Sequence, residues 1–157
     1  MLHGQRGSAE RLLTAPVRLR CVSWNVDQLS GSHYSAAELV PLLLGPEPAG
    51  LELVAIGLQE VEMTVGSFMS AAKSYKPSEK GRRWKESLTR ALEPEGFVLL
   101  DACQVMGLLS AVFARDAVAR RIRCVFHCFD EFCEFIVIFE FFPAATRRSA
   151  TRQSAAA

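Results

Sequence analysis

The sequence has no long uninterrupted apolar run, no evident internal repeat and no CxxC pair. Its most apolar stretch, residues 135–142, is too short to cross a bilayer and contains Glu140. The N-terminal residues lack the apolar run of a secretory signal, and their scattered arginines are only a weak sign of a transit peptide. We therefore expect a cytoplasmic protein without a membrane span.

A disulfide framework and a zinc site are also not indicated. The five cysteines are odd in number and irregularly spaced, so we expect reduced thiols in an intracellular protein. Cys124, His127, Cys128 and Cys133 cluster in the sequence, but they lack the paired spacing of a structural zinc site.

Net charge is nearly zero, with 18 basic and 17 acidic residues, yet the segment 73–90 carries seven basic residues against two acidic ones. Such a segment suits contact with phosphates or with an anionic membrane surface. A solvated helix face is the commoner explanation of a charge run. Peripheral membrane contact stays open, and nucleic acid is not an expected partner.

What the chain does contain is enough apolar sequence for one modest core, since half of its 157 residues are hydrophobic. Residues 17–26 alternate in polarity, which predicts a strand, and residues 51–58 predict a strand buried on both faces. Ser35 and Glu38 form a capping-box pattern for a short helix that Pro41 would end or disturb.

A second helix is predicted over 82–96, with Trp84, Leu88, Ala91 and Leu92 on one stripe, and Trp24 and Trp84 are assigned to the core. Two further strand-like runs, 97–105 and 107–115, suggest a hairpin. This order of elements predicts an α/β fold.

The chain divides into three parts on composition. Residues 1–16 read as a flexible leader, 17–123 as the domain, and 124–157 as an anomalous Phe-rich segment with a low-complexity basic tail. Seven of the ten phenylalanines lie between Phe126 and Phe142, in a pattern that fits neither an amphipathic helix nor a half-buried strand. We expect this end to reflect a frameshift, a retained intron or a truncated gene.

Chemistry is indicated where the first two predicted strands end. Asn25 ends the first strand, and Gln59 and Glu60 end the second. If these strands are neighbours, the side chains lie at one edge of the sheet, where open sheets bind ligands. Carboxylate and amide oxygens suit Mg²⁺, which needs only one or two protein carboxylates. An exposed glutamate after a strand is commonplace, so an ordinary polar turn stays the alternative.

A family resemblance bears on this choice. "RLRCVSWNV" (18–26), "LELVAIGLQEVEM" (51–63), "RRWKESLTRAL" (82–92) and "QVMGLLSAVFAR" (104–115) occur in the order found in the inositol polyphosphate 5-phosphatase domain. The chain resembles this branch of the endonuclease/exonuclease/phosphatase superfamily over residues 18–123. One departure is Asp27-Gln28, where the family often has Asn-Gly.

The resemblance implies a two-sheet α/β sandwich that is incomplete in this chain. It implies that Asn25 and Glu60 serve a Mg²⁺ and phosphate site, with Asn25 and Gln59 contacting substrate and Glu62 a solvated neighbour. The implied activity removes the 5-phosphate from phosphoinositides or inositol polyphosphates. The alternatives are a nuclease or sphingomyelinase of the same superfamily, or a non-catalytic inositide-binding protein.

Motifs that the family carries further along are absent from this sequence: Asn-Lys-Gly-Gly, Gly-Asp-x-Asn-Tyr-Arg, Ala-Trp-Cys-Asp-Arg and Ser-Asp-His. None of His3, His33 and His127 corresponds to the family's catalytic histidine, and each is interpreted as incidental. No catalytic base is therefore assigned, and we expect the chain by itself to be inactive.

Overall fold

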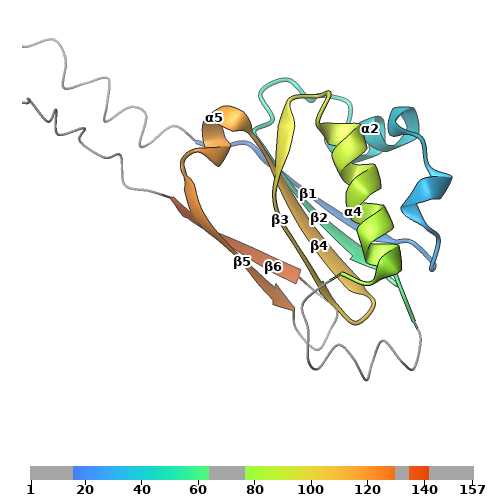
Figure 1. Ribbon diagram of the computed structural model, residues 1–157. Helices are drawn as coiled ribbons and strands as arrows, with labels where there is room; N and C mark the ends of the chain where they lie inside the picture. The colour runs from blue at the N-terminus through green and yellow to red at the C-terminus, as the bar shows by residue number, and fades with distance from the viewer. Residues whose placement is uncertain (1–15, 64–76, 130–134, 142–157) are drawn as a thin grey trace, which may run out of the picture. The chain divides into compact units, whose positions relative to one another are not determined.

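The structure of the protein is a computed structural model that describes residues 16–63, 77–129 and 135–141. Residues Val17–Phe141 form one compact unit (Figure 1). No helix within the described residues is long and apolar enough to cross a membrane. Residues 1–15 of the predicted leader, the segment 64–76 and the basic tail lie outside the described residues.

A four-stranded mixed sheet forms the main part of this unit, with the strand order β1-β2-β4-β3. Strands β1 and β2 are parallel, whereas β4 runs antiparallel to both of its neighbours. The strands are β1 (Leu19–Asn25), β2 (Leu53–Gln59), β3 (Phe97–Val105) and β4 (Leu108–Arg115). All four predicted strands are confirmed, and the mixed α/β class with them.

Strand β2 lies inside the sheet, as its apolar sequence predicts. Six of its seven residues are buried, and Gln59 at its end is half-buried. Val54, Ile56 and Leu58 belong to the main apolar core, while Leu53 belongs to a smaller cluster with Ala114. An interior strand can be apolar on both faces because both are covered.

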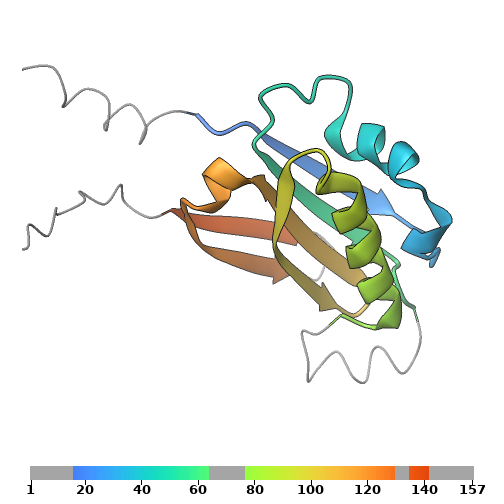
Figure 2. The same ribbon diagram turned by 45° about the horizontal axis from the view of Figure 1, so that its top comes forward.

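Two helices, α2 (Ala36–Leu44) and α4 (Glu79–Leu92), cover the same face of the sheet (Figures 1 and 2). The capping box predicted for α2 is present, since Ser35 and Glu38 hydrogen-bond to each other's backbone N–H. Pro41 lies inside α2 rather than at its end, and the helix continues to Leu44 although proline supplies no N–H.

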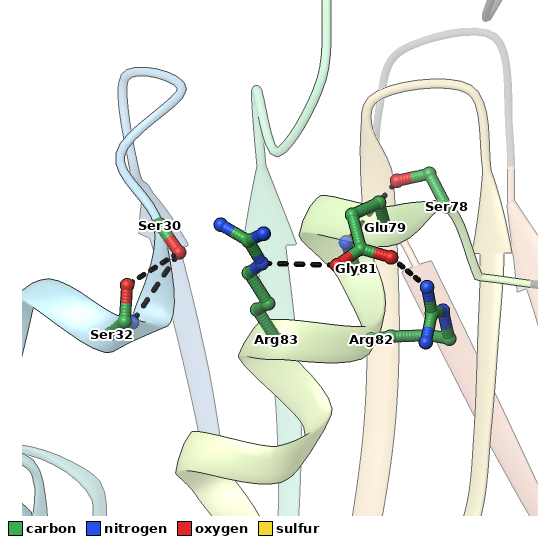
Figure 3. A network of polar contacts seen from close by, with 7 residues as sticks. All are labelled: Ser30, Ser32, Ser78, Glu79, Gly81, Arg82 and Arg83. Atoms are coloured by element: carbon green, nitrogen blue, oxygen red, sulfur yellow. Dashed lines mark hydrogen bonds and ion pairs between the residues drawn. The ribbon is translucent and has the colours of Figure 1, made fainter.

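Helix α4 begins three residues earlier than the predicted Arg82, because Ser78 accepts a hydrogen bond from the Gly81 N–H and caps it. The four residues of the predicted apolar stripe are all buried. Glu79 forms surface ion pairs with Arg82 and Arg83 (Figure 3). These pairs fit the solvated-helix interpretation, and membrane contact by this segment stays a prediction.

The Phe-rich segment differs most from its prediction. Instead of fitting no regular element, it forms an antiparallel pair of strands, β5 (Ile122–Phe129) and β6 (Phe135–Phe141). Phenylalanine at nearly every third position hides the two-residue period by which a strand is recognised. Two further short elements among the described residues are the 3₁₀ helix η1 (Gly31–His33) and α5 (Asp116–Ala119).

Candidate functional site

Asn25 and Glu60 meet at the carboxyl ends of β1 and β2. Asn25 pairs with Gln59 in the parallel register, so Glu60 follows directly beside it. The Asn25 Nδ2 donates a hydrogen bond of 2.8 Å to the Glu60 Oε1. The predicted neighbourhood of these two side chains is therefore present. Asn25 is exposed and Glu60 is half-buried, which leaves the pair accessible from solvent.

The orientation of the Asn25 amide follows from its second contact. Its Oδ1 accepts a hydrogen bond of 2.9 Å from the backbone N–H of Asp27, so its nitrogen faces Glu60. The other carboxylate oxygen of Glu60, Oε2, accepts no hydrogen bond from another described residue. Asn25 thus directs one oxygen of Glu60, and among the described residues the second carries no hydrogen bond.

The backbone at this site adopts a conformation that side chains with a Cβ rarely take. Asp27, Gln28 and Glu60 have φ angles of 46°, 59° and 56°. Each such residue costs on the order of 1–3 kcal/mol and persists only where its surroundings hold it. Two backbone hydrogen bonds hold these residues here. One runs from Val26 N to the Gln59 carbonyl at 2.9 Å, and the other from Gln28 N to the Glu60 carbonyl at 2.8 Å.

Helix α4 holds the loop that carries Asp27 and Gln28. The Lys80 Nζ donates to the Gln28 carbonyl at 3.1 Å, and the Trp84 Nε1 donates to the Leu29 carbonyl at 2.8 Å. Lys80 and Trp84 are four residues apart and so lie on one face of the helix. One helix face therefore supplies two donors to two consecutive carbonyls of the site loop.

Aromatic rings pack beneath this loop. Trp84 is fully buried, and its ring centroid lies 5.4 Å from that of Trp24 and 5.6 Å from that of Tyr34. Trp24 and Tyr34 meet edge to face at 5.1 Å. The two tryptophans serve packing, as predicted, and Trp84 also reaches the site loop through its indole N–H.

Gln59 and Glu62 are the two other polar residues beside Glu60 in the sequence. The Gln59 side chain donates to the Ser23 Oγ at 3.4 Å on the neighbouring strand, while its carbonyl holds Val26. Its predicted contact with substrate stays a prediction. Glu62 is half-buried two residues beyond Glu60.

Gln104, which the sequence analysis did not select, also connects to the site. It is only 5% exposed and uses both ends of its amide. Its Oε1 accepts from Ser78 N and its Nε2 donates to the Met106 carbonyl, both at 2.8 Å. The sequence shows only a glutamine inside the predicted strand 97–105; its burial, which makes defined hydrogen-bond partners expected, is visible only in the structure.

The described histidines lie elsewhere. His33 contacts the Ser30 carbonyl through Nδ1 at 3.0 Å. The His127 side chain is 5% exposed, with Nδ1 2.9 Å from the Ser110 Oγ and Nε2 3.4 Å from an Asp101 carboxylate oxygen. Burial lowers the pKa of His127, and the Asp101 charge opposes this. Nothing in the sequence indicates these contacts of His127, because they join strands that are distant in the chain.

The donor set at Asn25 and Glu60 fits a hard cation. It offers carboxylate and amide groups in a solvent-accessible place, and Mg²⁺ commonly binds through one carboxylate while it keeps several waters. Among the described residues, no three His, Cys, Asp or Glu side chains form a metal-binding group. Of the two side chains, Glu60 is the one with a carboxylate oxygen, Oε2, to which no other described residue donates a hydrogen bond.

Comparison with solved structures identifies the fold class. Over 80% of the chain, the structure matches the inositol polyphosphate 5-phosphatase domain of SPsynaptojanin, solved in complex with inositol (1,4)-bisphosphate and a calcium ion. The TM-score is 0.58 and the sequence identity is 18%. The mixed α/β sheet is therefore part of the fold of that phosphatase domain.

The sequence comparisons identify the family. Residues 22–128 match the Endonuclease/Exonuclease/phosphatase family 2, and the chain belongs to this family. It is 36% identical over 104 residues to type I inositol polyphosphate 5-phosphatase 13 of Arabidopsis thaliana. It is also 36% identical over 98 residues to type II inositol polyphosphate 5-phosphatase 15 of the same plant.

These matches cover much of this chain and little of the relatives. They span 63% and 59% of the chain, but only 9% and 8% of the two Arabidopsis proteins. The structural match spans 36% of the SPsynaptojanin chain.

Proposed function

We propose that this chain carries the N-terminal part of the active site of a Mg²⁺-dependent inositol polyphosphate 5-phosphatase. The observation that carries the proposal is the 2.8 Å contact between Asn25 and Glu60 at the carboxyl ends of two parallel strands. The relatives named 5-phosphatases, at 36% identity, support the choice of this branch. The substrate class is phosphoinositides or inositol polyphosphates that bear a 5-phosphate.

Glu60 would hold the cation through Oε2, and Asn25 would be the second ligand through the lone pair of Oδ1 that the Asp27 N–H does not use. Asn25 would keep the carboxylate in place, and its exposed amide would contact the substrate phosphate. Bound Mg²⁺ would neutralise charge that develops on the phosphate during hydrolysis. The residues that this chain supplies would therefore bind the cation and orient the substrate phosphate.

The chain on its own would release little or no phosphate. Hydrolysis of a phosphate monoester needs a group that orients or deprotonates water, and more cationic groups around the phosphate. The Ser-Asp-His and Gly-Asp-x-Asn-Tyr-Arg motifs that supply such groups in the family are absent from this sequence. Binding of a cation would thus be retained without turnover.

The test uses the purified 157-residue chain and two measurements. Phosphate release from a 5-phosphorylated inositide is followed with Mg²⁺, and Mn²⁺ binding is followed by electron paramagnetic resonance of the free ion. We expect negligible release, together with Mn²⁺ binding that Glu60→Gln abolishes and Glu62→Gln retains. The glutamine at position 60 can keep an oxygen as the acceptor for Asn25, while an uncharged NH2 group replaces the second oxygen and cannot bind a cation.

Two results would contradict the proposal in different ways. Phosphate release that Glu60→Gln abolishes would show that the chain is active by itself. Mn²⁺ binding that is equal in the two variants would show that Glu60 is not a cation ligand.

A further inference from the structure

Gln104 of β3 joins two segments that both lead to Glu60. Its Oε1 accepts from the N–H of Ser78, the residue that caps α4, and its Nε2 donates to the carbonyl of Met106 in the β3–β4 turn. Helix α4 approaches so closely that a Cβ on Gly81 would lie 2.0 Å from this Oε1. Gly81 therefore permits the contact, and Gln104 fixes the start of α4 against the turn.

The first path runs from the turn to the residue after Glu60. The carbonyl of Gly107 accepts a hydrogen bond of 2.9 Å from Val61 N. A Cβ on Gly107 would lie only 3.7 Å from the Glu60 Cα, so the turn is in van der Waals reach of the site backbone. The turn thus fixes the chain on the C-terminal side of Glu60.

The second path runs along α4 to the carbonyl of Glu60 itself. Lys80, in the first turn of the helix, donates to the Gln28 carbonyl, and Gln28 N donates to the Glu60 carbonyl at 2.8 Å. Glu60 is therefore held on both sides by hydrogen bonds that converge on one buried side chain. A left-handed residue of this kind requires such support.

We propose that Gln104 is a positioning residue of the Asn25–Glu60 site. By joining the N-terminus of α4 to the Met106–Gly107 turn, it holds Glu60 in the left-handed conformation that directs its carboxylate toward Asn25. This inference rests on the cation site proposed above. Gln104 touches neither cation nor substrate, and its effect on affinity passes through the backbone of Glu60.

The experiment compares three variants of the full chain. Gln104→Leu removes both amide contacts at similar size, whereas Gln104→Glu, measured at a pH where the new carboxyl is ionised, keeps the acceptor for Ser78 N and loses the donor to Met106. Ser110→Ala is the matched control, because Ser110 is also buried and polar but contacts His127 and not the site. Mn²⁺ affinity and native-state hydrogen exchange of the Gln28 and Val61 amides are measured for each.

We expect Gln104→Leu to weaken Mn²⁺ binding by up to about tenfold, the low end of the loss seen when a partner bonded directly to a metal ligand is removed, because Gln104 acts on Glu60 only through the backbone. Exchange at Gln28 and Val61 should accelerate more than exchange at Ile56 in the middle of β2. Gln104→Glu should affect Val61 more than Gln28, since its link to α4 remains. If Gln104→Leu does not fold, the test is the difference in hydrogen-exchange rate between the Val61 and Gln28 amides in Gln104→Glu.

The two readouts separate the inference from the function on which it rests. Mn²⁺ binding and exchange that match those of Ser110→Ala would overturn the role of Gln104 and leave the cation site standing. A wild-type chain that binds no Mn²⁺ would overturn the cation site. In that case, faster exchange at Gln28 and Val61 would still support the positioning of Glu60, and unchanged exchange would overturn it as well.

Discussion

Replacing Trp84 with phenylalanine tests whether α4 holds the site loop. Trp84 is fully buried, donates to the Leu29 carbonyl at 2.8 Å and packs edge to face on Trp24. Phenylalanine keeps an aromatic ring in this place but removes the indole N–H. The carbonyl of Leu29 then loses its partner.

The expected cost follows from these contacts. The hydrogen bond from Trp84 to the Leu29 carbonyl is only partly buried and Leu29 is 42% exposed, so its loss costs about 0.5–1.5 kcal/mol. An aromatic pair contributes about 0.5–1.5 kcal/mol beyond its buried area, and the smaller ring keeps part of this. We therefore expect Trp84→Phe to lower the free energy of unfolding by about 1–2.5 kcal/mol.

Urea unfolding followed by circular dichroism gives this free energy, and the fluorescence of the remaining Trp24 reports on the site. The matched control is Phe113→Leu, which changes another fully buried aromatic residue in β4. It should cost about 1 kcal/mol because no hydrogen bond is lost. Equal costs for the two variants, with unchanged hydrogen exchange at Leu29 and Tyr34, would refute the proposed hold on the loop.

Two further predictions concern pH and backbone strain. Burial lowers the pKa of His127, so the unfolded chain, in which a histidine titrates near pH 6.5, binds more protons than the folded one below about pH 7. The stability that neutral His127 contributes is therefore fully present above that pH and is lost as the pH falls toward 5. The urea midpoint should accordingly fall more steeply between pH 8 and 5 for wild type than for His127→Gln. Met106 has φ 53° and is 43% exposed, so Met106→Gly should raise the unfolding free energy by up to about 1 kcal/mol, because glycine adopts this conformation without a Cβ clash. A lower midpoint for Met106→Gly in urea would contradict this assignment of strain.

The sequence predicted those parts of the fold whose signals are local. The apolar run of β2, the Ser35–Glu38 box and the stripe from Trp84 to Leu92 each depend on residues close together in the chain. The meeting of Asn25 and Glu60 was predicted because parallel neighbouring strands end at the same edge.

The other features depend on contacts between distant residues, which periodicity does not encode. Gln104 contacts Ser78, 26 residues away, and His127 contacts Ser110, 17 residues away. The departure at Asp27-Gln28 is informative only in the structure, where both residues have positive φ angles. Glycine enters this conformation more readily than glutamine does, so Gln28 adopts it at a cost in backbone strain.

The register of β1 ties the site to the core. Val22 is buried in the core and Trp24 packs on Trp84, while the alternate positions Cys21, Ser23 and Asn25 are exposed. Because alternate residues face opposite sides, one inserted or deleted residue in this strand would exchange the two sets. The polar set would enter the core, and Asn25 would turn away from Glu60. In this strand, a change of length is therefore a more severe alteration than a change of side chain, and natural variation should be almost wholly by substitution.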